Sequence, residues 1–144
     1  MEQLLKQLDS GDEQQRLEAA ESLSGFGSFA AENATDALAQ ALDDESENVR
    51  YAALYALGAI GHDAKKALPE IRGRIDESDP AYERVLAAWA ATRIAPSDKL
   101  AQELAPALIK SLAESDMAVN SRATEALVNL GRAGHPQLIA ALDD

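Results

Sequence analysis

The sequence predicts an all-α protein, an α-solenoid of stacked antiparallel helix pairs with about four repeats and a terminal helix. One pattern recurs along the chain at spacings of 34, 34 and 36 residues, counted between Gln15, Val49, Glu83 and Val119. Within each copy the apolar residues recur at helical spacing, which is typical of amphipathic helices. Apolar residues make up 47% of the chain and aromatic residues only 4%, so the core consists mainly of Leu, Ala and Ile. A repeat of this length is typical of solenoid proteins.

The clearest copy of the repeat is residues 42–61. With Val49 as the origin and 100° per residue, Ala53, Ala56 and Ile60 all fall within about 40° of it. These residues therefore share one narrow face of a helix, and the alanines allow a neighbouring helix to approach closely. We expect this helix to be the second of a pair, preceded by an acidic turn.

The first two units follow from their capping residues. A leucine stripe predicts a helix at 1–9, and a second helix is expected at about 12–24, ended by Gly25 and Gly27. Thr35 is a suitable N-cap for the first helix of the second unit. Gly61 is suited to end the second helix of that unit.

Prolines mark the later units. Pro69 opens the first helix of the third unit, and Pro80 stands just inside its second helix, where its missing N–H is harmless. We expect Pro106 to open the fourth unit after a connector, and Pro136 to open the terminal helix. The chain is thus predicted to form one domain, with units at about 1–34, 35–68, 69–105 and 106–134 and a terminal helix at 135–144.

The columns that the copies share resemble HEAT repeats, particularly the short HEAT-like repeats of the phycobilisome bilin lyase type. The residues that carry the resemblance are Asp43, Val49, Arg50, Ala52, Ala53, Ala56, Leu57, Gly58, Ile60, Gly61, Pro69, Pro106 and Pro136. The resemblance covers essentially the whole chain and implies a right-handed superhelix, with first helices on its convex side and second helices on its concave side. Tetratricopeptide repeats share the period of about 34 residues, but their Trp, Leu-Gly and Tyr pattern is missing.

Composition and charge exclude several classes of function. The net charge is −12, which argues against nucleic-acid binding because phosphate contacts need clustered Lys and Arg. The chain has no cysteine, and its two histidines, His62 and His135, have no second ligand at helical spacing. We therefore predict no catalytic, cofactor-binding or metal-binding residue and no enzyme; a lyase-type or other enzyme is the least favoured alternative. There is no signal peptide and no apolar run of the roughly 20 residues that span a bilayer, so a cytoplasmic protein without membrane contact is expected.

Charged residues recur in two columns of the repeat. An Asp ends each first helix and an Arg follows in the second helix, as in the pairs Asp9 and Arg16, Asp43 and Arg50, and Asp76 and Arg84. In the fourth unit both are lost together, as Ala113 and Asn120. Because a partly buried charge that loses its partner is destabilising, joint loss predicts a ladder of Asp–Arg contacts, within or between adjacent units, that ties the turns to the second helices. The alternative is that both positions drift in a terminal repeat.

Large aromatic residues gather on the second helices, on the side opposite the core stripe. They are Tyr51, Tyr55, Tyr82 and Trp89, flanked by Leu86, and glutamates stand at the ends of the same face, as Glu21 and Glu125. If these rings are exposed, they form an aromatic patch with acidic rims that suits a protein segment carrying apolar and Lys or Arg side chains. We expect Tyr51, Tyr55 and Trp89 to be the anchors and the two glutamates to orient basic groups. The alternative is that neighbouring helices or the superhelical curvature bury the rings.

Two functions from different classes follow. The first is a protein–protein interaction scaffold that binds a basic or apolar protein segment on its concave face. The second is a structural spacer or a fragment of a longer solenoid. We expect a monomer, with end-to-end dimerisation as the alternative, because no second helix covers the terminal helix.

Overall fold

The computed structural model describes residues 1–75 and 80–131, which are almost entirely helical. The α-helices are α1 (Glu2–Leu8), α2 (Glu13–Ser24), α3 (Ala31–Gln40), α4 (Glu47–Ile60), α5 (Leu68–Arg72), α6 (Ala81–Ile94), α7 (Asp98–Ser111) and α8 (Met117–Leu130). Short 3₁₀-helices occur as η1 (Gly27–Ala30), η2 (Ala41–Asp43) and η3 (Gly61–Ala67). The described residues contain no strand. The predicted all-α class is confirmed.

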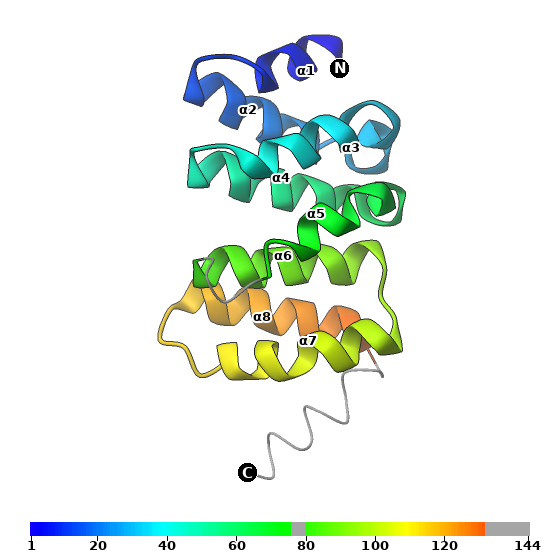
Figure 1. Ribbon diagram of the computed structural model, residues 1–144, viewed down its shortest axis with the longest axis vertical. Coiled ribbons are helices and arrows are strands. Elements are labelled where there is room, and N and C mark those ends of the chain that lie inside the picture. The colour runs from blue at the N-terminus through cyan, green and yellow to red at the C-terminus, as the bar shows by residue number, and fades with distance from the viewer. Residues whose placement is uncertain (76–79, 132–144) are drawn as a thin grey trace.

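The helices form a stack of antiparallel pairs (Figure 1). Helices α2, α4, α6 and α8 pack against one another in chain order, and α1, α3, α5 and α7 each pack against the second helix of their own pair. Each second helix thus contacts the second helices before and after it. This arrangement confirms the predicted solenoid and places the repeat columns of neighbouring units side by side.

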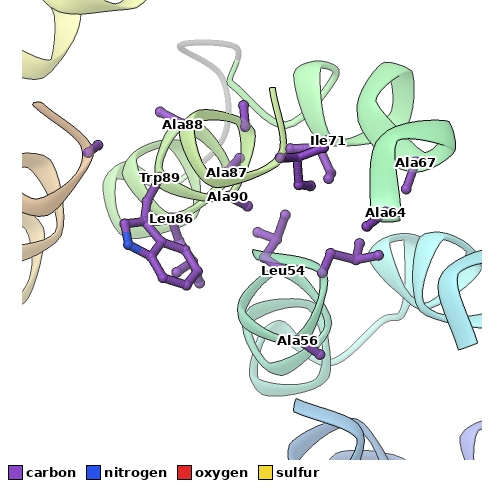
Figure 2. Close-up of a cluster of buried hydrophobic side chains, with 14 of the residues drawn as sticks. Leu54, Ala56, Ala64, Ala67, Ile71, Leu86, Ala87, Ala88, Trp89 and Ala90 are labelled. Carbon is purple, nitrogen blue, oxygen red and sulfur yellow. The ribbon is translucent and has the colours of Figure 1, made fainter. Parts of the chain in front are cut away.

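The core is built from Leu, Ala and Ile, as the composition predicts. Figure 2 shows Leu54 of α4 and Ile71 of α5 directed into the space between α4, α5 and α6, with Ala64 and Ala67 of η3 beside them. Leu54 and Ile71 are both fully buried. Burial of one such side chain contributes about 1.5–3 kcal/mol, so helices too short to be stable alone are held by this packing.

Local sequence explains where most helices begin and end. Asp12 caps α2 by accepting a hydrogen bond from the Gln15 backbone N–H at 3.1 Å, and Asp116 caps α8 in the same way. Gly61 ends α4 with a φ of 75°, a left-handed conformation that a residue with a side chain rarely adopts.

Two predicted boundaries are wrong. Helix α3 begins at Ala31, and Thr35 lies buried inside it, where its hydroxyl donates to the Ala31 carbonyl at 2.7 Å. Helix α7 runs through the predicted boundary at 105/106, because Ser97 caps it by accepting from the Leu100 N–H at 3.1 Å. Pro106 therefore lies inside the helix, on its exposed side, where water can reach the carbonyl that proline leaves without a donor.

The terminal helix predicted at 135–144 lies outside the described residues. Among the helices that are described, none is long and apolar enough to cross a membrane.

Candidate functional site

The aromatic residues form two ring pairs that join α4 to α6. Tyr51 and Tyr82 meet edge to face, with ring centroids 5.1 Å apart and planes at 81°. Tyr55 and Trp89 are stacked, with centroids 5.2 Å apart and planes at 6°. The repeat explains the pairing, because Tyr55 and Trp89 occupy the same column in consecutive units and consecutive second helices are neighbours. Such ring pairs contribute about 0.5–1.5 kcal/mol beyond their area burial.

The rings differ in exposure, and this corrects part of the sequence interpretation. Tyr55 is 43% exposed and Tyr51 and Tyr82 are half-buried, but Trp89 is only 5% exposed and Leu86 only 1%. The expectation that Trp89 is an exposed anchor, with Leu86 beside it, is therefore wrong. Figure 2 shows that the Trp89 ring leaves α6 on a different side from the packing around Ile71, but it is covered there as well.

A glycine explains why α4 covers Trp89. Gly58 is buried in α4, and a Cβ added to it would lie 2.3 Å from Cζ3 of Trp89. The indole ring thus occupies the space that a side chain at Gly58 would take. Arg93 adds a further contact, since its Cζ lies 5.4 Å from the Trp89 ring centroid while its Nε donates to the Gly58 carbonyl at 2.9 Å.

The tyrosines line a groove of about 440 Å³ on the face formed by α2, α4 and α6. Leu17 and Glu21 of α2 line one side of it, and Tyr51 and Tyr55 of α4 line its middle. Glu21 is exposed and forms no ion pair with any described residue. Glu125 was expected at the opposite rim but does not line the groove, because it lies on α8, and its carboxylate pairs with Arg122 of the same helix at 2.9 Å.

Tyr51 is held neutral within this groove. Its hydroxyl lies 3.5 Å from Oε2 of Glu47. Burial raises the pKa of Tyr51 above its usual value, and the negative charges of Glu47 and Glu83 raise it further. The phenol therefore keeps its proton at neutral pH, and its O–H is directed at the Glu47 carboxylate.

The arginine column forms inter-unit contacts, but the acceptors are not the predicted aspartates. Arg16 donates through Nε and Nη2 to Asp44 of the second unit, at 2.7 and 3.0 Å, and through Nη1 to the Ser10 carbonyl at 3.0 Å. Arg50 donates to both carboxylate oxygens of Glu83 in the third unit at 3.1–3.2 Å and to the Asp44 carbonyl at 3.0 Å. Each arginine thus joins the turn of its own unit to the next unit.

The predicted aspartates lie elsewhere for a geometric reason. Asp9 and Asp43 stand at the exposed ends of their first helices, and Asp43 pairs with Arg74 instead of Arg50. Asp76 lies outside the described residues, and Arg84 is half-buried on α6. The predicted ladder is therefore wrong in its acceptors, because neither Asp9 nor Asp43 forms an ion pair with Arg16 or Arg50, within a unit or between units.

The fourth unit shows what replaces an arginine of this column. Asn120 donates from its amide to the Leu112 carbonyl, so it keeps the bond to the turn, and its side chain bonds no other unit among residues 1–75 and 80–131. The joint change to Ala113 and Asn120 therefore does not report on pairing between an aspartate and an arginine.

These contacts shift the pKa values of Asp44 and Arg16. The hydrogen bond from Arg16 lowers the pKa of the Asp44 carboxyl below its ordinary value of 3.8, the Ser46 backbone N–H lowers it further, and burial opposes both. The same bond to Asp44 raises the pKa of Arg16.

Sequence reasoning missed several residues of this site. Glu83 carried a usable signal, because it stands in a column that holds Val49 and Val119, and a carboxylate in a core column needs a buried partner. Gly58 carried a weaker signal, because it is a glycine inside a segment whose other residues favour a helix. Arg122 carried none, since its role depends on rings of other units.

Other features of the described residues offer little chemistry. Within 1–75 and 80–131, no group of three or more His, Cys, Asp or Glu side chains is arranged to hold a metal ion. A second, largely apolar hollow of about 350 Å³ lies between α6 and α7, near Arg84 and Lys110, and contains none of the predicted aromatic anchors.

Comparison with known proteins places the fold. HEAT repeats match the sequence over residues 1–92. The crystal structure of an engineered protein is similar with a TM-score of 0.67 at 23% identity, over 99% of this chain and 66% of that one. A designed armadillo repeat protein is similar with a TM-score of 0.62 at 24% identity, over 96% of this chain and 69% of that one.

A further solved structure is a designed armadillo repeat protein in complex with the peptide (KR)4. It is similar with a TM-score of 0.61 at 23% identity, over 99% of this chain and 74% of that one. The chain thus spans about two thirds to three quarters of the length of these structures. Among proteins with curated descriptions, none matches the sequence. Because the HEAT repeat match covers 92 of the 144 residues and the structure is a stack of antiparallel helix pairs, the chain belongs to the HEAT repeat family.

Proposed function

We propose that this protein is an interaction scaffold whose tyrosine-lined groove binds a protein segment carrying apolar and basic side chains. The observation that supports this most is the exposure of Tyr55, which is 43% exposed although it is a large aromatic residue. A large ring of which one part stacks on Trp89 while 43% stays exposed, placed in a groove of about 440 Å³, is suited to binding.

Charge favours a basic segment over an acidic one. Glu21 lines the groove without an ion pair in the described part of the chain, and Glu47 lies beside the Tyr51 hydroxyl. The protein carries a net charge of −12, which attracts cationic partners and repels acidic ones. Tyrosine faces also bind Lys and Arg by cation–π attraction.

The fold is compatible with this use. A designed armadillo repeat protein with a similar fold carries a bound (KR)4 peptide, so a stack of helix pairs can present a peptide-binding face. No residue arrangement in the described part of the chain supports an enzyme instead. The alternative function, a structural spacer, assigns no binding role to the tyrosines.

A selection experiment tests the proposal without assuming the partner. A library of short random peptides is selected on the wild-type protein, and the enriched peptides are measured against Tyr55→Ala and Phe29→Ala. Phe29 is a matched control because it is an aromatic residue of η1, 89% exposed, outside the groove. We expect enriched peptides with Lys or Arg next to apolar residues, and binding that Tyr55→Ala weakens at least about ten-fold while Phe29→Ala leaves it unchanged.

The contrary results are equally clear. No enrichment, or peptides that bind Tyr55→Ala as well as wild type, would favour the spacer. Sedimentation of the unliganded protein at several concentrations tests the expected monomer against the end-to-end dimer.

A further inference from the structure

The stacked pair of Tyr55 and Trp89 already holds a cation from the protein itself. The guanidinium carbon of Arg122, on α8, lies 4.7 Å from the Trp89 ring centroid and 5.6 Å from that of Tyr55. Both distances are within the range of about 6 Å at which a cation is attracted to an aromatic face. One arginine of the fourth unit therefore contacts rings of the second and third units.

Arg122 is fixed in this position. Its Nη1 donates to Oε2 of Glu125 at 2.9 Å, one turn further along α8, and its side chain is only 19% exposed. The carboxylate holds the guanidinium from α8 while the rings hold it from α4 and α6. A basic side chain of a partner protein would have to make the same ring contacts to bind there.

The two sides of the aromatic cluster therefore differ in charge. On the α2 side Glu21 lines the groove beside Tyr51 and Tyr55 and has no cation among the described residues. On the α8 side Arg122 covers the rings and carries the opposite charge. Trp89 already has two arginines near its ring, Arg122 at 4.7 Å and Arg93 at 5.4 Å, so a further cation from a partner would meet like charges in a partly buried position, which is unfavourable.

We propose that Arg122 acts as an internal ligand of the Tyr55–Trp89 pair and thereby restricts the groove to a single basic residue, bound at the Glu21 side. The inference rests on the proposed function, because it concerns the ligand of the same groove. Adjacent helices are about 8–10 Å apart, so the Arg122 guanidinium lies roughly 12–15 Å from α2, about one and a half helix spacings. An extended segment covers that distance in about four residues. The preferred partner segment thus has a basic residue with about four uncharged or acidic residues on the side of it that faces Arg122.

A binding measurement with three variants tests this specificity. The probe is a fluorescently labelled (KR)4 peptide, whose densely spaced cations the wild-type groove should disfavour. We expect Arg122→Ala to bind (KR)4 about ten-fold more tightly than wild type, because the position over Tyr55 that Arg122 occupied becomes a second cation site, while Arg93 stays at Trp89. Arg122→Lys should stay near wild type, because a cation remains over the rings.

The third variant separates the ring site from a simple change in net charge. Lys65→Ala removes one positive charge from an exposed position of η3, away from the groove. If it strengthens (KR)4 binding as much as Arg122→Ala does, or if Arg122→Ala gives no gain, the internal-ligand inference is overturned. The gain should also disappear when Tyr55→Ala is combined with Arg122→Ala.

A second readout needs no partner. Trp89 is the only tryptophan of the chain, so its fluorescence reports on this site alone. Arg122→Ala should shift the emission to longer wavelength and increase quenching by acrylamide, whereas Lys65→Ala should change neither. If Arg122→Ala has the same Trp89 emission as wild type, the inference about Arg122 is refuted. The proposed function could still stand in that case, because it is tested separately by peptides from the library whose binding depends on Tyr55.

Discussion

Replacement of Arg50 by Ala tests the inter-unit contacts most sharply. The guanidinium of Arg50 donates three hydrogen bonds of 3.1–3.2 Å to the Glu83 carboxylate, which is 1% exposed, and Nη1 bonds the Asp44 carbonyl. Removal of one partner of a buried ion pair costs roughly 3–5 kcal/mol, because the other charge is left without compensation. The Arg50 side chain is 18% exposed, so water reaches the site and the lower end applies. We expect Arg50→Ala to lower the free energy of unfolding by about 3 kcal/mol.

Urea denaturation followed by far-ultraviolet circular dichroism measures this loss, and the dependence on urea should match that of wild type. The double variant Arg50→Ala, Glu83→Leu should be more stable than Arg50→Ala alone, since it no longer buries an unpaired carboxylate. Lys65→Ala is the control for loss of one positive charge and should lie within about 0.5 kcal/mol of wild type. The reasoning is refuted if Arg50→Ala is as stable as that control, or if adding Glu83→Leu destabilises it further.

Three other variants test separate features. Gly58→Ala gains up to about 1 kcal/mol of helix propensity but places a Cβ against the Trp89 ring. Thermal unfolding should therefore show that the free energy of unfolding falls by about 1–2 kcal/mol, and a rise would contradict the close contact. Asp44→Asn should be less stable than wild type at pH 7. Because the folded-state pKa of Asp44 is lowered below 3.8, its contribution is present above that value and lost as the pH falls through the folded pKa. The difference between Asp44→Asn and wild type in urea titrations should therefore shrink below about pH 4, and a constant difference would exclude this origin. Phe29→Ser should change the free energy of unfolding by less than about 0.5 kcal/mol, since the ring is 89% exposed.

The sequence predicted the repeat architecture well because the evidence for it is local. Val49, Ala53 and Ile60 define a buried helix face by their spacing alone, and all three are buried. Capping signals were less reliable, since Thr35 and Pro106 have the right chemistry for helix starts but lie inside helices. In both cases an earlier start, at Ala31 or after the Ser97 cap, extended the helix across the expected boundary.

The candidate site was predicted in part. The positions of Tyr51, Tyr55 and Trp89 on one face were correct, whereas the sequence left open whether the arginine column acts within or between units. The predicted exposure of Trp89 and the predicted acceptor of Arg50 were wrong. A helical wheel gives the direction of a side chain from its own helix, but not which neighbouring residues cover it.

The sequence by itself therefore determined the all-α class, the repeat period and the residues of each core stripe. The class and the core stripes depend on residues within about ten positions of one another along a helix, and the period is read by comparing copies of the same pattern along the chain. Only the tertiary structure decided that Trp89 is buried, because Gly58 and Arg122 lie 31 and 33 residues away in the chain and meet it through the stacking of units. The same stacking selected Glu83 over the aspartates as the acceptor for Arg50, since the packing of α4 on α6 sets which carboxylate is within hydrogen-bonding distance.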